Sequence, residues 1–273
     1  EDVLGSQSEE KTQKHLIILP HIHGEEHYEN ESFRYHQQQQ NILQNISFHV
    51  KPGQTIGIVG RSGSGKSTLV KLLGGLYHPD SGHILIDGYD VAKVSRYSFR
   101  RQLGVAPQEF FLFSGTILEN ITLYNREFSF EQVQTAAKLS GAHTFIQELP
   151  LGYSTIIGER GIKLESAQQR KIAIARALVK DPRILILDEP RSCLDSQSEF
   201  QFQLNLARFN RVSINTSSTF RTTFIVAPSL ASIFITDTIL VLDRGLLAEQ
   251  GTHEELMRES RIYPSLIQQQ LNM

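Results

Sequence analysis

The chain has 273 residues, of which 40% are hydrophobic, and its formal net charge is −2. This composition predicts a globular protein with a sizeable core, and it gives no long-range attraction to nucleic acid or anionic lipid, so no nucleic-acid partner is expected. A single cysteine, Cys193, excludes an intrachain disulfide and indicates a reducing compartment. No apolar run approaches about eighteen residues, no signal peptide is recognisable, and the polar start at Glu1 suggests a piece of a longer protein.

Residues 1 to about 30 are rich in Glu, Gln, Ser and His, which predicts a linker or partly ordered arm ahead of a domain spanning residues 31–273. The spacing of the histidines in this arm matches no common zinc pattern, so a solvated linker is favoured over a metal site. These histidines are His15, His21, His23 and His27. Residues 32–35 and 42–50 then predict the strands of a β-rich opening.

Residues 60–68 read Gly-Arg-Ser-Gly-Ser-Gly-Lys-Ser-Thr and fit the phosphate-loop pattern G-x-x-x-x-G-K-[ST]. The apolar run 56–59 before them and the apolar residues within 69–73 after them predict strand, loop and helix, which favours a phosphate loop over a Gly/Ser-rich surface turn. Backbone N–H groups and the helix dipole would surround the phosphates, with Lys66 reaching the β- and γ-phosphates and Ser67 on Mg²⁺. The expected nucleotide ligands are Gly60, Ser62, Gly63, Ser64, Gly65, Lys66, Ser67 and Thr68.

Strands and helices alternate after the loop, which predicts an α/β protein with a mostly parallel sheet. Further strands are expected at 83–87, 104–107, 183–189, 222–227 and 238–242. Helices are expected mostly within 116–180, as an insertion, and from residue 254 to the end. The run 184–187 consists of four apolar residues and leads into Asp188 and Glu189, a form typical of a buried parallel strand with a site at its carboxyl end.

Three polar residues at strand ends are candidates for the chemistry. Asp188 is placed to hold Mg²⁺ directly or through water, and Glu189 to polarise an attacking water. Gln108, by itself more typical of a surface residue, is placed to touch the metal or the water. An Asp-Glu pair is a weak signal alone and a strong one downstream of a phosphate loop.

With these motifs, the sequence from about residue 31 to 270 resembles the nucleotide-binding domain of ABC transporters, most of all the haemolysin-type exporters. The resemblance implies a P-loop NTPase (RecA-like) core, an N-terminal antiparallel β subdomain and a helical subdomain at about 109–180. It implies ATP and Mg²⁺ as cofactors, with Tyr35 stacking on adenine and Ser67, Gln108 and Asp188 as metal ligands. Glu189 and Gln108 would be catalytic. The segments 111–121, 158–161, 192–195 and 251–256 match the exporter-type stretch, the X-loop, the D-loop and the closing motif.

The resemblance also implies an ABC-type ATPase that couples Mg-ATP binding and hydrolysis to substrate translocation. Its partners would be a transmembrane domain and a second nucleotide-binding domain, in an ATP-dependent homodimer or heterodimer at the cytoplasmic face of a membrane. A soluble ABC protein without a membrane partner is disfavoured by the exporter-like X-loop and the single-domain length.

Two positions depart from the family pattern. Glu165 occupies the serine position of the signature Leu-Ser-Gly-Gly-Gln, and Pro228 occupies the position of the switch histidine. A carboxylate facing a phosphate at ~4 Å is repelled by about 1 kcal/mol in water and about 4 kcal/mol at an effective dielectric near 20, although Ser166 could supply a hydroxyl one position along. Proline offers no donor. Hydrolysis is therefore expected to be weak, and the alternative is a catalytically degenerate ATP-binding regulatory domain that gates a partner.

Overall fold

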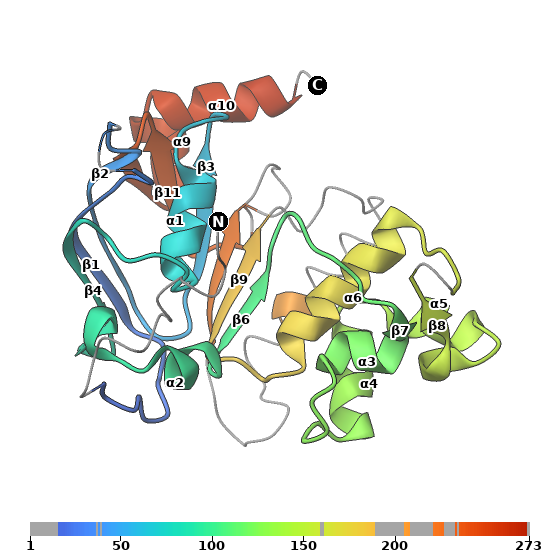
Figure 1. The fold of residues 1–273 in the computed structure, drawn as a ribbon. Helices are drawn as coiled ribbons and strands as arrows, with labels where there is room; N and C mark the ends of the chain where they lie inside the picture. Colours follow the sequence, from blue (N-terminus) through green and yellow to red (C-terminus); the bar gives the residue numbers. More distant parts are fainter. Residues whose placement is uncertain are drawn as a thin grey trace.

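The computed structural model describes residues 16–36, 38, 40–158, 161–188, 205–207, 221–226, 233 and 235–271. A central sheet with the strand order β12-β11-β3-β10-β9-β6 crosses this part of the chain (Figure 1). Its strands are β3 (Thr55–Gly60), β6 (Leu103–Ala106), β9 (Ile184–Asp188), β10 (Thr222–Val226), β11 (Thr238–Asp243) and β12 (Leu246–Gly251). All neighbouring pairs are parallel except β11 and β12. The inner strands are apolar because helices and a second sheet cover their faces.

A second, outer sheet has the order β2-β1-β4-β5 and is antiparallel. Its strands are β1 (Glu26–Phe33), β2 (Leu43–Val50), β4 (Ser81–Ile86) and β5 (Tyr89–Asp90). Helix α1 (Lys66–Leu73) lies between this sheet and β3 in Figure 1, and one apolar core joins Leu43 and Phe48 of β2 to Leu69 and Leu72 of α1. The outer sheet therefore packs against the helix that follows the phosphate loop and holds it in position.

The helical part lies on the β6 side of the central sheet, in green and yellow in Figure 1. It contains α3 (Ile117–Thr122), α4 (Phe130–Leu139), α5 (His143–Glu148) and α6 (Ser166–Leu178), with the small hairpin β7 (Gly115–Thr116) and β8 (Ile156–Ile157). Capping boxes start α3 at Thr116 and α4 at Ser129, because each side chain accepts a backbone N–H that the helix itself leaves unbonded. Helix α6 packs against β6 and so joins this part to the central sheet.

Three further α-helices and two 3-10 helices, Val91–Lys93 and Gly152–Ser154, lie in the described part of the chain. The short α2 (Arg96–Arg100) precedes β6, while α9 (His253–Glu259) and α10 (Ile262–Leu271) follow β12. His253 Nδ1 lies 2.7 Å from the Tyr263 hydroxyl, which ties α9 to α10. Among the residues that the structure describes, no helix combines the length and the apolar character needed to cross a bilayer.

The predicted fold class is confirmed: a mostly parallel central sheet, an antiparallel N-terminal sheet and an inserted helical part. Strand boundaries differ at the start. β1 begins at Glu26, inside the range expected to be an arm, and Leu19 and Ile22 ahead of it are buried. It also ends at Phe33 rather than residue 35. The sequence does not predict β12, because its residues do not alternate between apolar and polar; in the structure they are at most half-buried. The domain boundaries themselves stay a prediction.

Candidate nucleotide-binding site

The phosphate loop, residues 60–68, joins β3 to α1 at the carboxyl end of the parallel strands. Neighbouring atoms leave little room for a side chain at Gly60 and Gly65. A Cβ atom on Gly60 would lie 2.3 Å from the Leu242 carbonyl oxygen of β11, and one on Gly65 would lie 2.7 Å from the Leu43 side chain, with φ at +104°. A side chain at Gly60 would therefore force the loop to move, and one at Gly65 would be strained by the positive φ.

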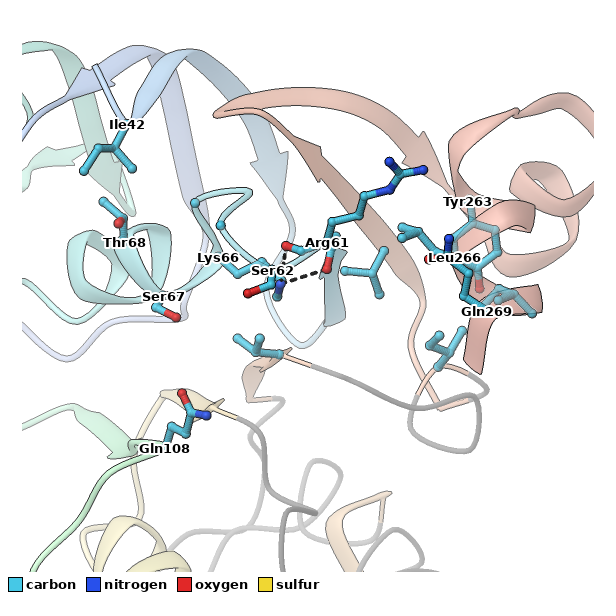
Figure 2. A pocket seen from close by; sticks show the side chains of 17 residues that line it. Ile42, Arg61, Ser62, Lys66, Ser67, Thr68, Gln108, Tyr263, Leu266 and Gln269 are labelled. Carbon is cyan, nitrogen blue, oxygen red and sulfur yellow. Dashed lines mark hydrogen bonds between the residues drawn. The ribbon is translucent and has the colours of Figure 1, made fainter. Parts of the chain in front are cut away.

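The interior of the loop has the chemistry of an anion site. Lys66 Nζ donates hydrogen bonds to the carbonyl oxygens of Gly60 at 2.8 Å and Arg61 at 2.9 Å, so the ammonium is turned into the loop (Figure 2). The Ser64 hydroxyl is buried and has no hydrogen-bond partner among the described residues. An inward ammonium, an unsatisfied buried hydroxyl and the first N–H groups of α1 together fit a bound phosphate.

A cavity of about 1060 Å³ opens in front of the loop, which is room for a nucleotide. Gln108, just beyond β6, and Val226, at the end of β10, line it together with the loop. Figure 2 shows Gln108 across the cavity from Lys66 and Ser67, so three predicted ligands from two separate strand ends face one space. The α10 residues Tyr263, Leu266, Ile267 and Gln269 form another wall, which sequence reasoning missed.

Asp188 ends β9 and is 7% exposed. It does not line the cavity, but it pairs in register with Val226, which does. A buried arginine of α6, Arg170, fixes this end of the sheet: its guanidinium donates to the carbonyl oxygens of Asp188 and, at 3.2 Å, of Gln108. Arg170 thus positions the backbone of Gln108 and Asp188, two of the three predicted metal ligands. In the sequence, the signal for this role of Arg170 is a charged residue within the predominantly apolar face of the predicted helix.

Tyr35 is placed beside α1 and does not line the cavity. Its hydroxyl lies 3.2 Å from the Thr68 hydroxyl and accepts from Lys71 Nζ at 3.3 Å, while its ring packs edge-on against Phe33 and Tyr77. Tyr35 therefore contacts Thr68, which lines the cavity, but does not line the cavity itself. Its stacking on adenine stays a prediction.

Several predicted functional residues lie outside the described residues, namely Glu189, Pro228, the D-loop residues 192–195 and the X-loop residues 159–160. Their roles stay predictions. The altered signature is described: Glu165 and Ser166 are exposed at the start of α6, where the Glu165 N–H donates to the Gln168 side-chain oxygen at 3.1 Å. Glu165 is the N-cap residue of α6 and forms a capping box with Gln168, so its side chain lies at the surface, engaged with the first turn of the helix.

Comparisons with known proteins agree with this geometry. Residues 43–192 match the family described as ABC transporter. The chain is 45% identical over 270 residues to the alpha-hemolysin translocation ATP-binding protein HlyB of Escherichia coli O157:H7, an alignment covering 98% of the chain and 37% of that relative. It is 45% identical over 272 residues to the leukotoxin export ATP-binding protein LtxB of Aggregatibacter actinomycetemcomitans, covering 99% of the chain and 37% of LtxB.

A solved structure of a bacterial Atm1-family ABC exporter with ATP bound superposes with a TM-score of 0.83 at 38% identity, covering 96% of the chain and 46% of the exporter. The chain thus spans well under two thirds of the length of each of these proteins.

Proposed function

Since this chain belongs to the ABC transporter family, we propose that it is the ATP-binding domain of an exporter. It would bind Mg-ATP in the cavity beside the phosphate loop and couple binding and hydrolysis to translocation. A transmembrane domain would be its partner, in the same polypeptide or as a separate chain, and would place it at the cytoplasmic face of a membrane. A second nucleotide-binding domain would complete the ATP-dependent dimer.

The observation that carries this proposal is the convergence of Lys66, Ser67 and Gln108 on one cavity. Lys66 supplies a cation for the β- and γ-phosphates, and the loop N–H groups supply donors. The Ser67 hydroxyl and the Gln108 side chain, with Asp188 directly or through water, offer the oxygen ligands that Mg²⁺ requires. Bound Mg²⁺ would neutralise phosphate charge, and Glu189 would accept a proton from the attacking water.

Turnover is expected to be weak. In this family the signature of one domain covers the nucleotide held by the other, and the exposed Glu165 would bring a carboxylate to that place. Pro228 would remove the donor that the switch histidine supplies. Loss of one transition-state donor typically costs a factor of ~10² to 10³, so two losses would leave a homodimer nearly inactive. A heterodimer with an intact partner would lose less, because the partner's signature would cover this domain's ATP.

A catalytically degenerate regulatory domain is the second candidate, and the exposed Glu165 at the start of α6 is what favours it. The two functions separate when the ATPase rate of the chain is compared with that of Glu189→Gln, alongside ATP affinity from a fluorescent ATP analogue. A rate at least about tenfold above Glu189→Gln supports the enzyme. Equal rates with tight binding support the regulatory domain, and no ATP binding contradicts both.

Restoring the altered motifs tests the reason for weak turnover. Glu165→Ser, Ser166→Gly, Ala167→Gly and Pro228→His combined should raise the ATPase rate, while Glu148→Ser, on the exposed surface of α5, should not. No gain from the combined variant would mean that the defect lies elsewhere or that the motifs are misaligned.

A further inference from the structure

Glu25, His27 and His49 meet on the exposed face of the outer sheet. In β1 the side chains of Glu26 and Tyr28 are buried, so alternation along the strand turns the neighbouring Glu25 and His27 outward. His49 of β2 is the direct cross-strand partner of His27. Residues from two strands are thus brought together by the register of the sheet.

The three side chains converge on a single point. The Glu25 Oε1 atom lies 2.9 Å from His49 Nε2 and 3.4 Å from His27 Nε2. The two imidazole rings are 3.8 Å apart, centre to centre. All three ligand atoms fall within 4.8 Å of one another, and no other such group of three occurs in the described part of the chain.

The backbone that carries these side chains is fixed. The Asp87 carboxylate accepts the N–H groups of Gly24 at 3.1 Å and Glu25 at 2.8 Å, and the Glu25 carbonyl accepts the Asp87 N–H at 3.0 Å. On the opposite face of β1, Tyr28 stacks on Phe48 of β2 at 4.2 Å. The site is therefore preorganised, whereas a chance meeting of surface side chains has no such support.

We propose that Glu25, His27 and His49 bind one divalent cation of the zinc class, with water completing the coordination. Two imidazole nitrogens and one carboxylate oxygen are ligands that Zn²⁺ prefers, and tetrahedral coordination at 2.0–2.2 Å places neighbouring ligand atoms about 3.3–3.6 Å apart. The separation of 3.4 Å between Glu25 Oε1 and His27 Nε2 falls in that range, and the 2.9 Å to His49 Nε2 requires only a small outward shift of one side chain. Mg²⁺ prefers oxygen ligands, so the ion of the nucleotide site does not suit this one.

The cation would act as a clamp between β1 and β2. Each side chain is about 40% exposed, so the ion can enter from solvent and keep water ligands. The competing account is an ion pair of Glu25 with protonated histidines, in keeping with the pKa of Glu25, which hydrogen bonds from His49 and His27 lower. The two accounts differ in whether Zn²⁺ binds with a defined stoichiometry.

Isothermal titration of ZnCl₂ into the nucleotide-free chain tests the proposal. One Zn²⁺ should bind per chain, excess MgCl₂ should not displace it, and Co²⁺ at the same site should give visible d–d absorption. His27→Ala, His49→Ala and Glu25→Gln should each weaken Zn²⁺ binding at least about tenfold. His83→Ala, on the neighbouring strand β4 with a 67% exposed side chain, is the matched control and should leave binding unchanged.

Circular dichroism establishes that each variant is folded, and thermal unfolding gives a second readout. Zn²⁺ should raise the Tm of the wild-type chain and of His83→Ala, but not that of the His27→Ala, His49→Ala double variant. No saturable Zn²⁺ binding would leave only the ion pair and overturn the proposal. Binding that survives unchanged in the double variant would overturn it as well, because the ion would then be held elsewhere. Neither result depends on ATP binding or hydrolysis.

Discussion

In the central sheet, β9 buries four consecutive apolar residues and carries its first carboxylate, Asp188, at the strand end, whereas β1 of the outer sheet buries Glu26 and Glu31 within its length. Polar groups at the carboxyl ends of parallel strands share an edge and can build a site. Carboxyls inside a strand of the outer sheet face the apolar core instead. A carboxyl group is thus placed at a candidate site in one sheet, while in the other sheet it affects the free energy of unfolding.

The largest expected effect concerns the outer sheet. Burial raises the pKa of both Glu26 and Glu31 to about 8 from the ordinary 4.5. Folding therefore favours the protonated carboxyls, so their contribution to stability is intact below about pH 4.5 and is lost as the pH rises through about 8. The free energy of unfolding should fall by several kcal/mol across this window, as measured by urea denaturation at a series of pH values.

The Glu26→Gln, Glu31→Gln double variant should flatten this pH dependence, since amides do not titrate. Glu29→Gln, exposed on the same strand, is the matched control and should keep the wild-type slope. A wild-type profile without the decline would show that the buried carboxyls are not neutral in the folded protein.

In the central sheet, the largest effect is expected from Gly60→Ala. Its Cβ would lie 2.3 Å from the Leu242 carbonyl oxygen and 2.5 Å from Ser64 Oγ, so the phosphate loop must shift. We expect ATP affinity to fall by more than tenfold and the unfolding free energy to drop by about 3 kcal/mol. Gly88→Ala is the control: φ is also positive there, at +80°, but nothing lies within 4 Å of its Cβ. Equal losses in the two variants would contradict the steric account.

A smaller effect on binding, without loss of the fold, is expected from Lys66→Ala. Removing the ammonium from the loop should cost about 1.5–3 kcal/mol of phosphate binding, a roughly 10- to 150-fold weaker affinity in a fluorescent ATP titration. Lys93→Ala removes the same charge from an exposed lysine that pairs with Asp90 and should change affinity by less than about twofold. Retained ATP affinity in Lys66→Ala would mean that nucleotide binds away from the loop.

The smallest effect is expected at the edge of the central sheet. The Glu249 carboxylate of β12 accepts the N–H groups of Arg261, Ile262 and Tyr263, each at 3.0 Å, and so caps α10, one wall of the cavity. Glu249→Gln should lower the unfolding free energy by about 1 kcal/mol. Glu254→Gln, exposed on α9, should change it by no more than about 0.5 kcal/mol. A Glu249→Gln variant as stable as wild type would show that the cap contributes little.

The sequence by itself determined the phosphate loop, the apolar strands of the central sheet and the α/β class. These features are encoded locally, because a loop motif and an apolar strand each depend on contiguous residues. The ATP-binding family could be recognised for the same reason. The position of Gln108 at a strand end predicts that it touches the metal or the water, but that it faces Lys66 across one cavity depends on how the strands pack.

Only the tertiary structure decided how α10 and Arg170 join the site, because both contacts depend on how distant segments pack. It also decided the orientation of side chains in β1. Asn30 adopts a φ of +50° within a register shift between Tyr28 and Glu31, and this irregularity turns Glu31 inward, where plain alternation from Tyr28 would turn it out. The spacing of the histidines before residue 30 matches no zinc pattern and so favours a solvated linker, whereas the pairing of β1 with β2 brings His49 opposite His27. Register and bulges arise from pairing between strands, and no single stretch of sequence contains them.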